Sequence, residues 1–397
     1  MGERDRERVA LVTRALAAEG LDALLCTLPS NVLLVSGYWP VVGNAIAVVT
    51  REGQVAVAAP EDEKVFAEAG WADDLRTFSS GSLDQLVETA DTASHTLRDL
   101  ASALEIEPGS TIGVEGSAWL DPSGYAAKFV YGAGVHRLLA AAFQSAGSVD
   151  ASACLARLRS ALTGGELASL RRACAIARDA FIATSWAIEP GTSETEVAAL
   201  LRAQLDASGN PTDRCDGYAY CMSGANAANA WAAYQHSGPR VIARGDFVLL
   251  HCNSYANGFC TDITRTYSIG PPGVEESAII KAVMSARRAA LAAVRPGVAA
   301  CEVDRAARAE MESRGFGKAF KHPTGHGVGF AAIDHNARPR IHPKSAETLE
   351  PGMVFNIEPA AYLPPLGGMR HCDMVLVTGD GAELLTDFQT EVADLVL

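Results

Sequence analysis

The chain has 397 residues, of which 48% are hydrophobic and 20% charged, so it is long enough for more than one domain and too apolar to be disordered. Its 47 acidic residues outnumber its 33 lysines and arginines, which gives a formal net charge of −14. A field of this sign repels nucleic acids and anionic membranes, and we expect neither as a partner.

The start of the chain and its thiols predict a cytoplasmic protein. Residues 1–20 carry charges from the third position onward and read as an amphipathic helix, not as a signal peptide. The sequence contains no run of about 18 apolar residues that would span a membrane. The nine cysteines form no C-x-x-C pair, and an odd number of thiols fits a reducing compartment better than a disulfide framework.

Residues 1–155 predict an N-terminal α/β domain, because helical patterns alternate there with short β-rich runs. The expected helices cover residues 4–19, 61–70 and 83–104, and the apolar or β-rich runs cover residues 21–27, 31–38, 45–50, 54–60 and 111–116. The turn dipeptide Glu52-Gly53 separates two of these runs. The sequence places no cluster of catalytic residue types in this domain.

Residues 156–397 predict a second domain with two related halves. Pro190-Gly191 and Pro296-Gly297 lie 106 residues apart, each after a long helical pattern, and each is followed by Glu-Val, Arg and Gly at matching distances. Pro-Gly commonly ends helices, but the shared spacing favours a duplicated helix–turn–helix–strand unit whose halves face a central site. β-rich runs follow each copy, at 245–270 and then at 354–363 and 369–378. We therefore expect an α+β domain with helices outside a curved, largely antiparallel sheet.

Histidines and carboxylates concentrate in this second domain. Six of the nine histidines lie between positions 251 and 371, and Asp262, Glu358 and Asp373 lie inside β-rich runs. A carboxylate in an apolar strand is costly to bury unless a metal, a cation or several hydrogen bonds compensate it. Each residue alone fits a rim or core position, but their grouping around the glycine-flanked His326 favours a functional site.

Several phrases in this region are ordered and spaced as in one known family. They are DITRT at 262–266, HPTGHGVGF at 322–330, NIEP at 356–359 and MRHCDMVLVTGDGAELLT at 369–386. They resemble the pita-bread family (peptidase family M24), which comprises methionine aminopeptidases, Xaa-Pro aminopeptidases, prolidases and creatinase. The phrase N-x-x-x-x-S-G-Y at 31–38 is similar to the N-terminal domain of the prolidase/creatinase branch. The resemblance covers nearly the whole chain. It implies an α/β N-terminal domain, an α+β pita-bread domain with pseudo-twofold duplicated halves, a hydrolase and a homodimer.

Most members of this family bind two divalent metals through Asp, Asp, His, Glu and Glu. The resemblance assigns the second Asp to Asp262, the His to His326 and the first Glu to Glu358, but His251 and Cys372 stand at the other two positions. Because only two obligate anions remain, a second dication would be poorly neutralised. We expect the five residues to hold one borderline-soft divalent ion, Zn²⁺ or Fe²⁺.

A site without metal is the competing interpretation. Creatinase, in the same family, hydrolyses a C–N bond at an amidino group without a metal, and its metal positions are also substituted. It depends, however, on a histidine where this chain has Trp231, and it lacks the acid that Asp262 retains.

Further candidate residues flank the predicted ligands. The family phrase S-G-x-N-x-x-x-x-H reads SGANAANAW here, so the resemblance places Trp231 in the substrate pocket. His322 and His335 are expected to position the substrate or to stabilise an oxyanion. Arg370 is expected to contact substrate or to pair with a carboxylate.

The sequence therefore predicts a hydrolase of a C–N bond (amide, imide or amidine-like) in a small-molecule or dipeptide-like substrate. One metal would activate water, and Glu358 would act as the general base. Four alternatives remain open: a metal-free creatinase-like amidinohydrolase, an Xaa-Pro dipeptidase or aminopeptidase, a mononuclear iron enzyme that uses oxygen, and a non-catalytic pseudopeptidase.

Overall fold

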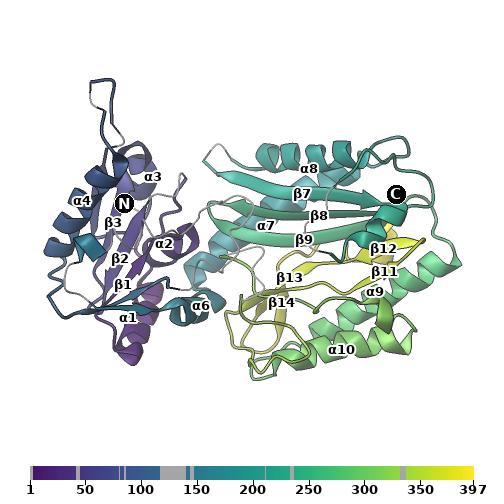
Figure 1. Cartoon of the computed structure of the whole chain (residues 1–397). Coiled ribbons are helices and arrows are strands. Elements are labelled where there is room, and N and C mark those ends of the chain that lie inside the picture. Colours follow the sequence, from purple (N-terminus) through teal and green to yellow (C-terminus); the bar gives the residue numbers. More distant parts are fainter. Residues whose placement is uncertain are drawn as a thin grey trace. The chain divides into compact units, whose positions relative to one another are not determined.

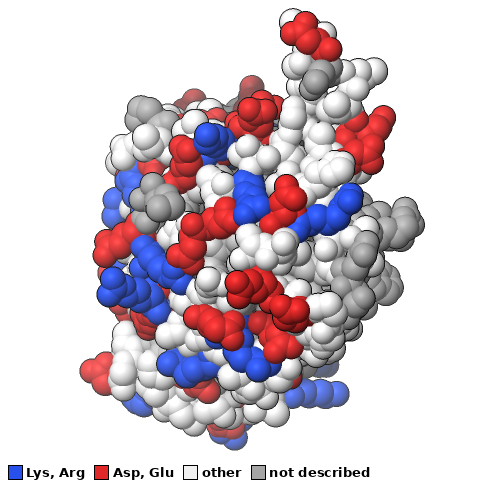
Figure 2. Space-filling model, turned by 90° about the vertical axis from the view of Figure 1, so that its left-hand side faces the viewer, with Lys and Arg blue, Asp and Glu red and all other residues white. Residues whose placement is uncertain are grey.

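The computed structural model describes residues 3–41, 45–79, 81–84, 86–116, 140–143, 147–210, 212–232, 237–330 and 337–397 (Figure 1). The chain divides into two compact units, Met1–Arg159 and Ser160–Leu397. Within the described residues, no helix is both long and apolar enough to cross a membrane. On the face shown in Figure 2, acidic and basic side chains are interspersed.

The first unit is built on a six-stranded sheet in the order β4-β3-β2-β1-β5-β6. β1 pairs antiparallel with β2 and parallel with β5, so the sheet is mixed. Its strands are β1 (Ala23–Cys26), β2 (Ile46–Thr50), β3 (Val55–Pro60), β4 (Asp74–Phe78), β5 (Thr111–Val114) and β6 (Gly147–Asp150). Its described α-helices are α1 (Arg6–Glu19), α2 (Pro29–Ser36), α3 (Lys64–Glu68), α4 (Thr89–Ala103) and α6 (Ser152–Ser160). The expected alternation of helices and strands is present.

The N-x-x-x-x-S-G-Y phrase is explained by packing in this unit. The Asn31 amide donates a hydrogen bond of 2.7 Å to the buried carboxylate of Glu115. Gly37 ends α2 at φ 69°, a left-handed conformation that favours glycine. The hydroxyl of the buried Tyr38 donates to the carboxylate of Glu63 at 2.6 Å. The phrase therefore fixes the position of α2.

The second unit contains the two helix pairs expected for duplicated halves (Figure 1). The first pair is α7 (Gly164–Ser185) and α8 (Glu194–Ser208), and the second is α9 (Val274–Ala293) and α10 (Ala300–Ser313). The helices of each pair pack against each other. Gly191 and Gly297, at φ 103° and 82°, lie in the connecting turns, so the repeated Pro-Gly marks the same turn in each half.

Antiparallel strands form the inner layer of this unit. Its strands are β7 (Cys215–Ser223), β8 (Phe247–Ala256), β9 (Phe259–Ser268), β10 (Val354–Ile357), β11 (Ala360–Leu363), β12 (Gly367–Arg370), β13 (Asp373–Val377) and β14 (Ala382–Leu384). β8 and β9 form the predicted hairpin through Asn257-Gly258, both at positive φ. α7 and α8 pack against β7–β9, and a bridge between Thr264 and Cys372 connects β9 to the segment that precedes β13.

Two β-rich runs that the sequence predicts as continuous strands are in fact interrupted. The run 354–363 breaks at Glu358-Pro359, and the run 369–378 breaks at His371-Cys372. Pro359 has no backbone N–H to contribute to a strand ladder. The breaks lie opposite each other, since Ile357 pairs with Asp373 on one side and Ala360 with Arg370 on the other. Two predicted site residues, Glu358 and Cys372, therefore leave the regular ladder together.

A buried carboxylate in the first turn of α8 holds the SGAN segment that leads to Trp231. Glu194 accepts hydrogen bonds from the backbone N–H and hydroxyl of Ser223, at 2.6 and 2.9 Å. It also accepts bonds from the Asn226 amide at 2.8 Å and the Gly238 N–H at 2.9 Å. The Ser and Asn of this phrase thus have a structural role.

Replacing Glu194 with alanine should destabilise the second unit by about 3 kcal/mol, because several donors lose a buried acceptor. Urea unfolding followed by fluorescence measures the change. Glu196→Ala, on the exposed side of the same helical turn, is the matched control and should cause a clearly smaller loss. Equal losses for the two variants would show that the Glu194 bonds do not stabilise the unit.

Candidate active site

Asp262 is the centre to which the predicted site residues converge. It lies buried on β9, beside His251 of β8 and next to Cys372 at the strand break. Its carboxylate lies 3.9 Å from Nδ1 of His251 and 3.5 Å from Sγ of Cys372. The structure therefore brings these three residues together, as the sequence predicts.

Asp262 and His326 form an ion pair, with Oδ2 3.5 Å from Nε2. Burial alone would lower the pKa of His326, but the hydrogen bond and charge of Asp262 raise it to about 9. Burial would likewise raise the pKa of Asp262, but His326 and His251 lower it to about 2. Nδ1 of His326 donates to the Gly327 carbonyl, 3.0 Å away, and Nε2 lies 3.3 Å from the amide nitrogen of Asn356.

The glycines on either side of His326 allow the backbone to approach its neighbours closely. A Cβ on Gly325 would overlap the carbonyl oxygen of Asn356, and one on Gly327 would overlap that of Arg338. The Asn356 side chain also accepts a 2.7 Å hydrogen bond from the His326 N–H. The GHG phrase is therefore required by packing around the histidine.

Glu358 faces Arg370 across the site, with Oε2 3.9 Å from Nε. Burial raises the pKa of Glu358 to about 7, with Arg370 acting in the opposite direction. Arg370 is itself held by the hydroxyls of Thr264, at 3.0 Å, and Tyr220, at 2.7 Å. Arg370 therefore lies beside Glu358, and its contact with substrate stays a prediction.

Both ring nitrogens of His251 are occupied by side-chain hydrogen bonds. Nε2 donates to Oδ1 of Asn253 at 2.9 Å, and Nδ1 accepts from the Thr264 hydroxyl at 2.8 Å. The ring also packs against Tyr220, with centroids 4.6 Å apart. Burial and the charge of Arg370 lower the pKa of His251 to about 4, so the imidazole is neutral.

Cys372 is a buried, protonated thiol. Its Sγ lies 3.2 Å from the backbone carbonyl of Asp262, to which it donates. Burial, together with the charges of Asp262 and Glu358, raises the pKa of the thiol well above its usual value.

The other predicted residues lie at the edge of this cluster. His322 accepts from the Tyr362 hydroxyl at 2.9 Å and donates to the Pro323 carbonyl at 2.8 Å, so neither ring nitrogen is free for a substrate. Trp231 is 47% exposed, and the Lys321 ammonium lies 4.9 Å from the centroid of its ring. His335 falls outside the described residues, and its role stays a prediction.

The donor set in this arrangement does not fit a divalent metal. Across the described ranges, no group of three His, Cys, Asp or Glu side chains is arranged to hold an ion. The nitrogens of His251 are bonded to other side chains, and the Cys372 thiol retains its proton. Ligation by His251, Asp262, His326, Glu358 and Cys372 therefore remains a prediction, and no chemical step is derived through a metal.

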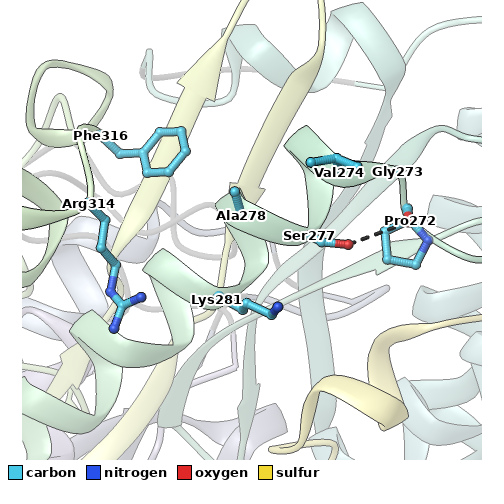
Figure 3. Close-up of a pocket in the computed structure, with 8 residues that line it drawn as sticks. All are labelled: Pro272, Gly273, Val274, Ser277, Ala278, Lys281, Arg314 and Phe316. Carbon is cyan, nitrogen blue, oxygen red and sulfur yellow. Dashed lines mark hydrogen bonds between the residues drawn. The ribbon is translucent and has the colours of Figure 1, made fainter.

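A separate surface hollow lies away from these residues, at the start of α9 and beyond the end of α10 (Figure 3). None of the predicted site residues lines it. Its lining residues are Pro272, Gly273, Val274, Ser277, Ala278, Lys281, Arg314 and Phe316.

The Cys372 thiol should resist alkylation in the folded protein, because it is buried and protonated while alkylation needs an accessible thiolate. Timed iodoacetamide labelling read by peptide mass spectrometry measures this, with the partly exposed Cys301 as internal reference. Labelling of Cys372 as fast as Cys301 would contradict the assignment.

Comparisons with known proteins agree with this fold. The sequence pattern of metallopeptidase family M24 matches residues 168–379, and that of the creatinase/prolidase N-terminal domain matches residues 8–161. An Xaa-Pro dipeptidase of Pyrococcus furiosus is 34% identical over 59% of this chain and 65% of its own length. The uncharacterized peptidase YqhT of Bacillus subtilis is 30% identical over 65% of this chain and 71% of its own length.

Solved structures extend the likeness to the whole chain. A prolidase from Pyrococcus horikoshii superposes with a TM-score of 0.76 at 25% identity, covering 96% of this chain and 98% of the other. An X-Pro aminopeptidase from Thermotoga maritima has the same fold, with a TM-score of 0.79 at 23% identity over 97% of this chain and 100% of the other. The predicted two-domain fold, with a pita-bread second domain, is thereby confirmed. Divalent metals are typical of this family, so membership alone would lead to the expectation of a bound metal. The chain belongs to metallopeptidase family M24, in its two-domain prolidase/creatinase branch, and is a hydrolase of that family.

Proposed function

We propose that this chain hydrolyses the C–N bond of a small amide that carries a carboxylate, with Xaa-Pro dipeptides as the first candidates. The observation that carries the proposal is the position of Glu358. Its partly exposed carboxylate lies opposite Arg370, and the charges of Asp262 and His326 influence its pKa. The similarity to an Xaa-Pro dipeptidase supports the same bond type.

In the proposed reaction, Glu358 accepts a proton from a water molecule as the water oxygen attacks the carbonyl carbon. The guanidinium of Arg370 stabilises the negative charge on the carbonyl oxygen. Glu358 then returns the proton to the nitrogen as the C–N bond breaks, so one water is consumed and the products are an acid and an amine. Asp262 positions His326.

The charge of the substrate is suggested by Trp231 and Lys321. Trp231 follows Ala230, whose carbonyl lies 3.5 Å from Arg370, and Lys321 precedes His322. Because the Lys321 ammonium already lies over the indole, a cationic substrate group would meet a like charge there. A substrate carboxylate would instead meet the opposite charge of the Lys321 ammonium. This favours a dipeptide-like substrate over the amidine of a creatinase-like reaction.

Replacing Glu358 with glutamine should lower kcat/KM on the best Xaa-Pro dipeptide by roughly 10²–10⁴-fold, because the isosteric amide cannot accept the proton. The measurement is product release by chromatography, with circular dichroism to confirm folding. Unchanged turnover would remove Glu358 as the base. Oxygen uptake coupled to turnover would favour the iron-dependent alternative, and no turnover of any amide, imide or amidine would favour the pseudopeptidase.

Replacing Lys321 with alanine should raise KM roughly fivefold with little change in kcat, since an exposed ion pair contributes up to about 1 kcal/mol. Lys318→Ala, three residues away and also exposed, is the matched control. A substrate whose carboxylate is converted to an amide should not distinguish the two variants. An equal KM for all three proteins on the carboxylate substrate would contradict the role of Lys321.

A homodimer also remains a prediction, supported by the match to the two-domain branch.

A further inference from the structure

His251 stands where the family has a metal-binding Asp, and both of its ring nitrogens form hydrogen bonds within the protein. Its Nε2 donates to Asn253 and its Nδ1 accepts from Thr264. The Thr264 hydroxyl has one proton, which goes to Nδ1, and its oxygen accepts from Nε of Arg370 at 3.0 Å. A metal at His251 would therefore have to displace one bond of a connected, buried network.

The position of Cys372 is occupied by a thiol whose surroundings oppose ionisation. Its Sγ lies 3.2 Å from the Asp262 carbonyl oxygen and 3.5 Å from the Asp262 carboxylate. A thiolate would stand directly beside a negative charge, and the Asn356 amide, at 3.6 Å, is the donor that faces the sulfur. The thiol fills space and donates one hydrogen bond.

The two carboxylates that remain each face a side chain of the chain itself. Asp262 lies 3.5 Å from His326, and Glu358 lies 3.9 Å from the Arg370 guanidinium, whose own position is fixed by Tyr220 and Thr264. Relative to a site with four carboxylates, His251 and Cys372 remove two negative charges, and Arg370 offsets a third. Less negative charge is then left to attract a dication.

We infer that this chain carries no divalent metal at the family's metal position: the guanidinium of Arg370 provides positive charge beside Glu358, and His251 and Cys372 fill the space of two ligands. The site is thus a metal-independent version of a metallopeptidase site. His251, which stands in place of one ligand, also belongs to the hydrogen-bond network through Thr264.

The first test is metal content. Protein purified without a metal-affinity tag is incubated separately with Mn²⁺, Zn²⁺ and, without oxygen, Fe²⁺, then gel-filtered and analysed by elemental mass spectrometry. We expect far less than one ion per chain and no change of Tm with any of the metals or with EDTA. About one ion per chain that survives gel filtration, and that is lost in Cys372→Ser, would overturn the inference.

The second test restores the missing charges. The double variant His251→Asp/Cys372→Glu regains four carboxylates, so Mn²⁺ should bind to it and raise its Tm, because a ligand that binds only the folded state stabilises it. The matched control is His251→Asn/Cys372→Gln, which has similar shapes without the charges and should not respond. A wild-type Tm that rises with Mn²⁺ as much as that of the charged variant would contradict the inference.

These readouts do not involve turnover, so they are independent of the substrate. If the charged variant does not fold, as judged by circular dichroism, the metal content of the wild-type chain decides alone. If no Xaa-Pro dipeptide is cleaved, the metal measurements still stand, and only the proposed substrate is lost.

Discussion

Compensation of two carboxylates, one buried and one partly exposed, is the constraint on which the site depends. Asp262 is buried and Glu358 is partly exposed among β-strands, where an unpaired charge would be costly. His326 lies beside Asp262, and the Arg370 guanidinium lies beside Glu358. Thr264 links Arg370 to His251, next to Asp262, because it accepts from Arg370 and donates to His251. Charge balance, side-chain orientation and the protonation of the site are therefore set by one network.

In each half of the second unit, a buried helix carboxylate holds a segment that leads to the site. In the first half, Glu194 at the start of α8 holds Ser223 and the segment toward Trp231. In the second half, the buried Asp304 of α10 accepts from the backbone N–H and hydroxyl of Thr324, at 3.0 and 2.8 Å, two residues before His326. Each helix pair thus provides a carboxylate that anchors a site-bearing segment, which is a structural reason for the repeat.

The sequence predicted the parts of the site that belong to local motifs. Asp262, His326, Glu358 and Arg370 were identified from phrases with fixed spacing, and all of them meet in the structure. Tyr220 and Asn253 were missed, because their roles depend on strand register, and a single sequence carries no signal of which residues face each other across a sheet.

The interruptions at Glu358 and Cys372 were missed for a related reason, since apolar runs on both sides read as continuous strands.

If protein side chains take the place of metal ions at this site, crystals soaked in Mn²⁺ should show no anomalous diffraction peak within about 2.5 Å of the carboxylate oxygens of Asp262 and Glu358. A strong peak bound to both carboxylates, with the His251 or Cys372 side chain turned toward it, would instead show that the chain binds a metal there.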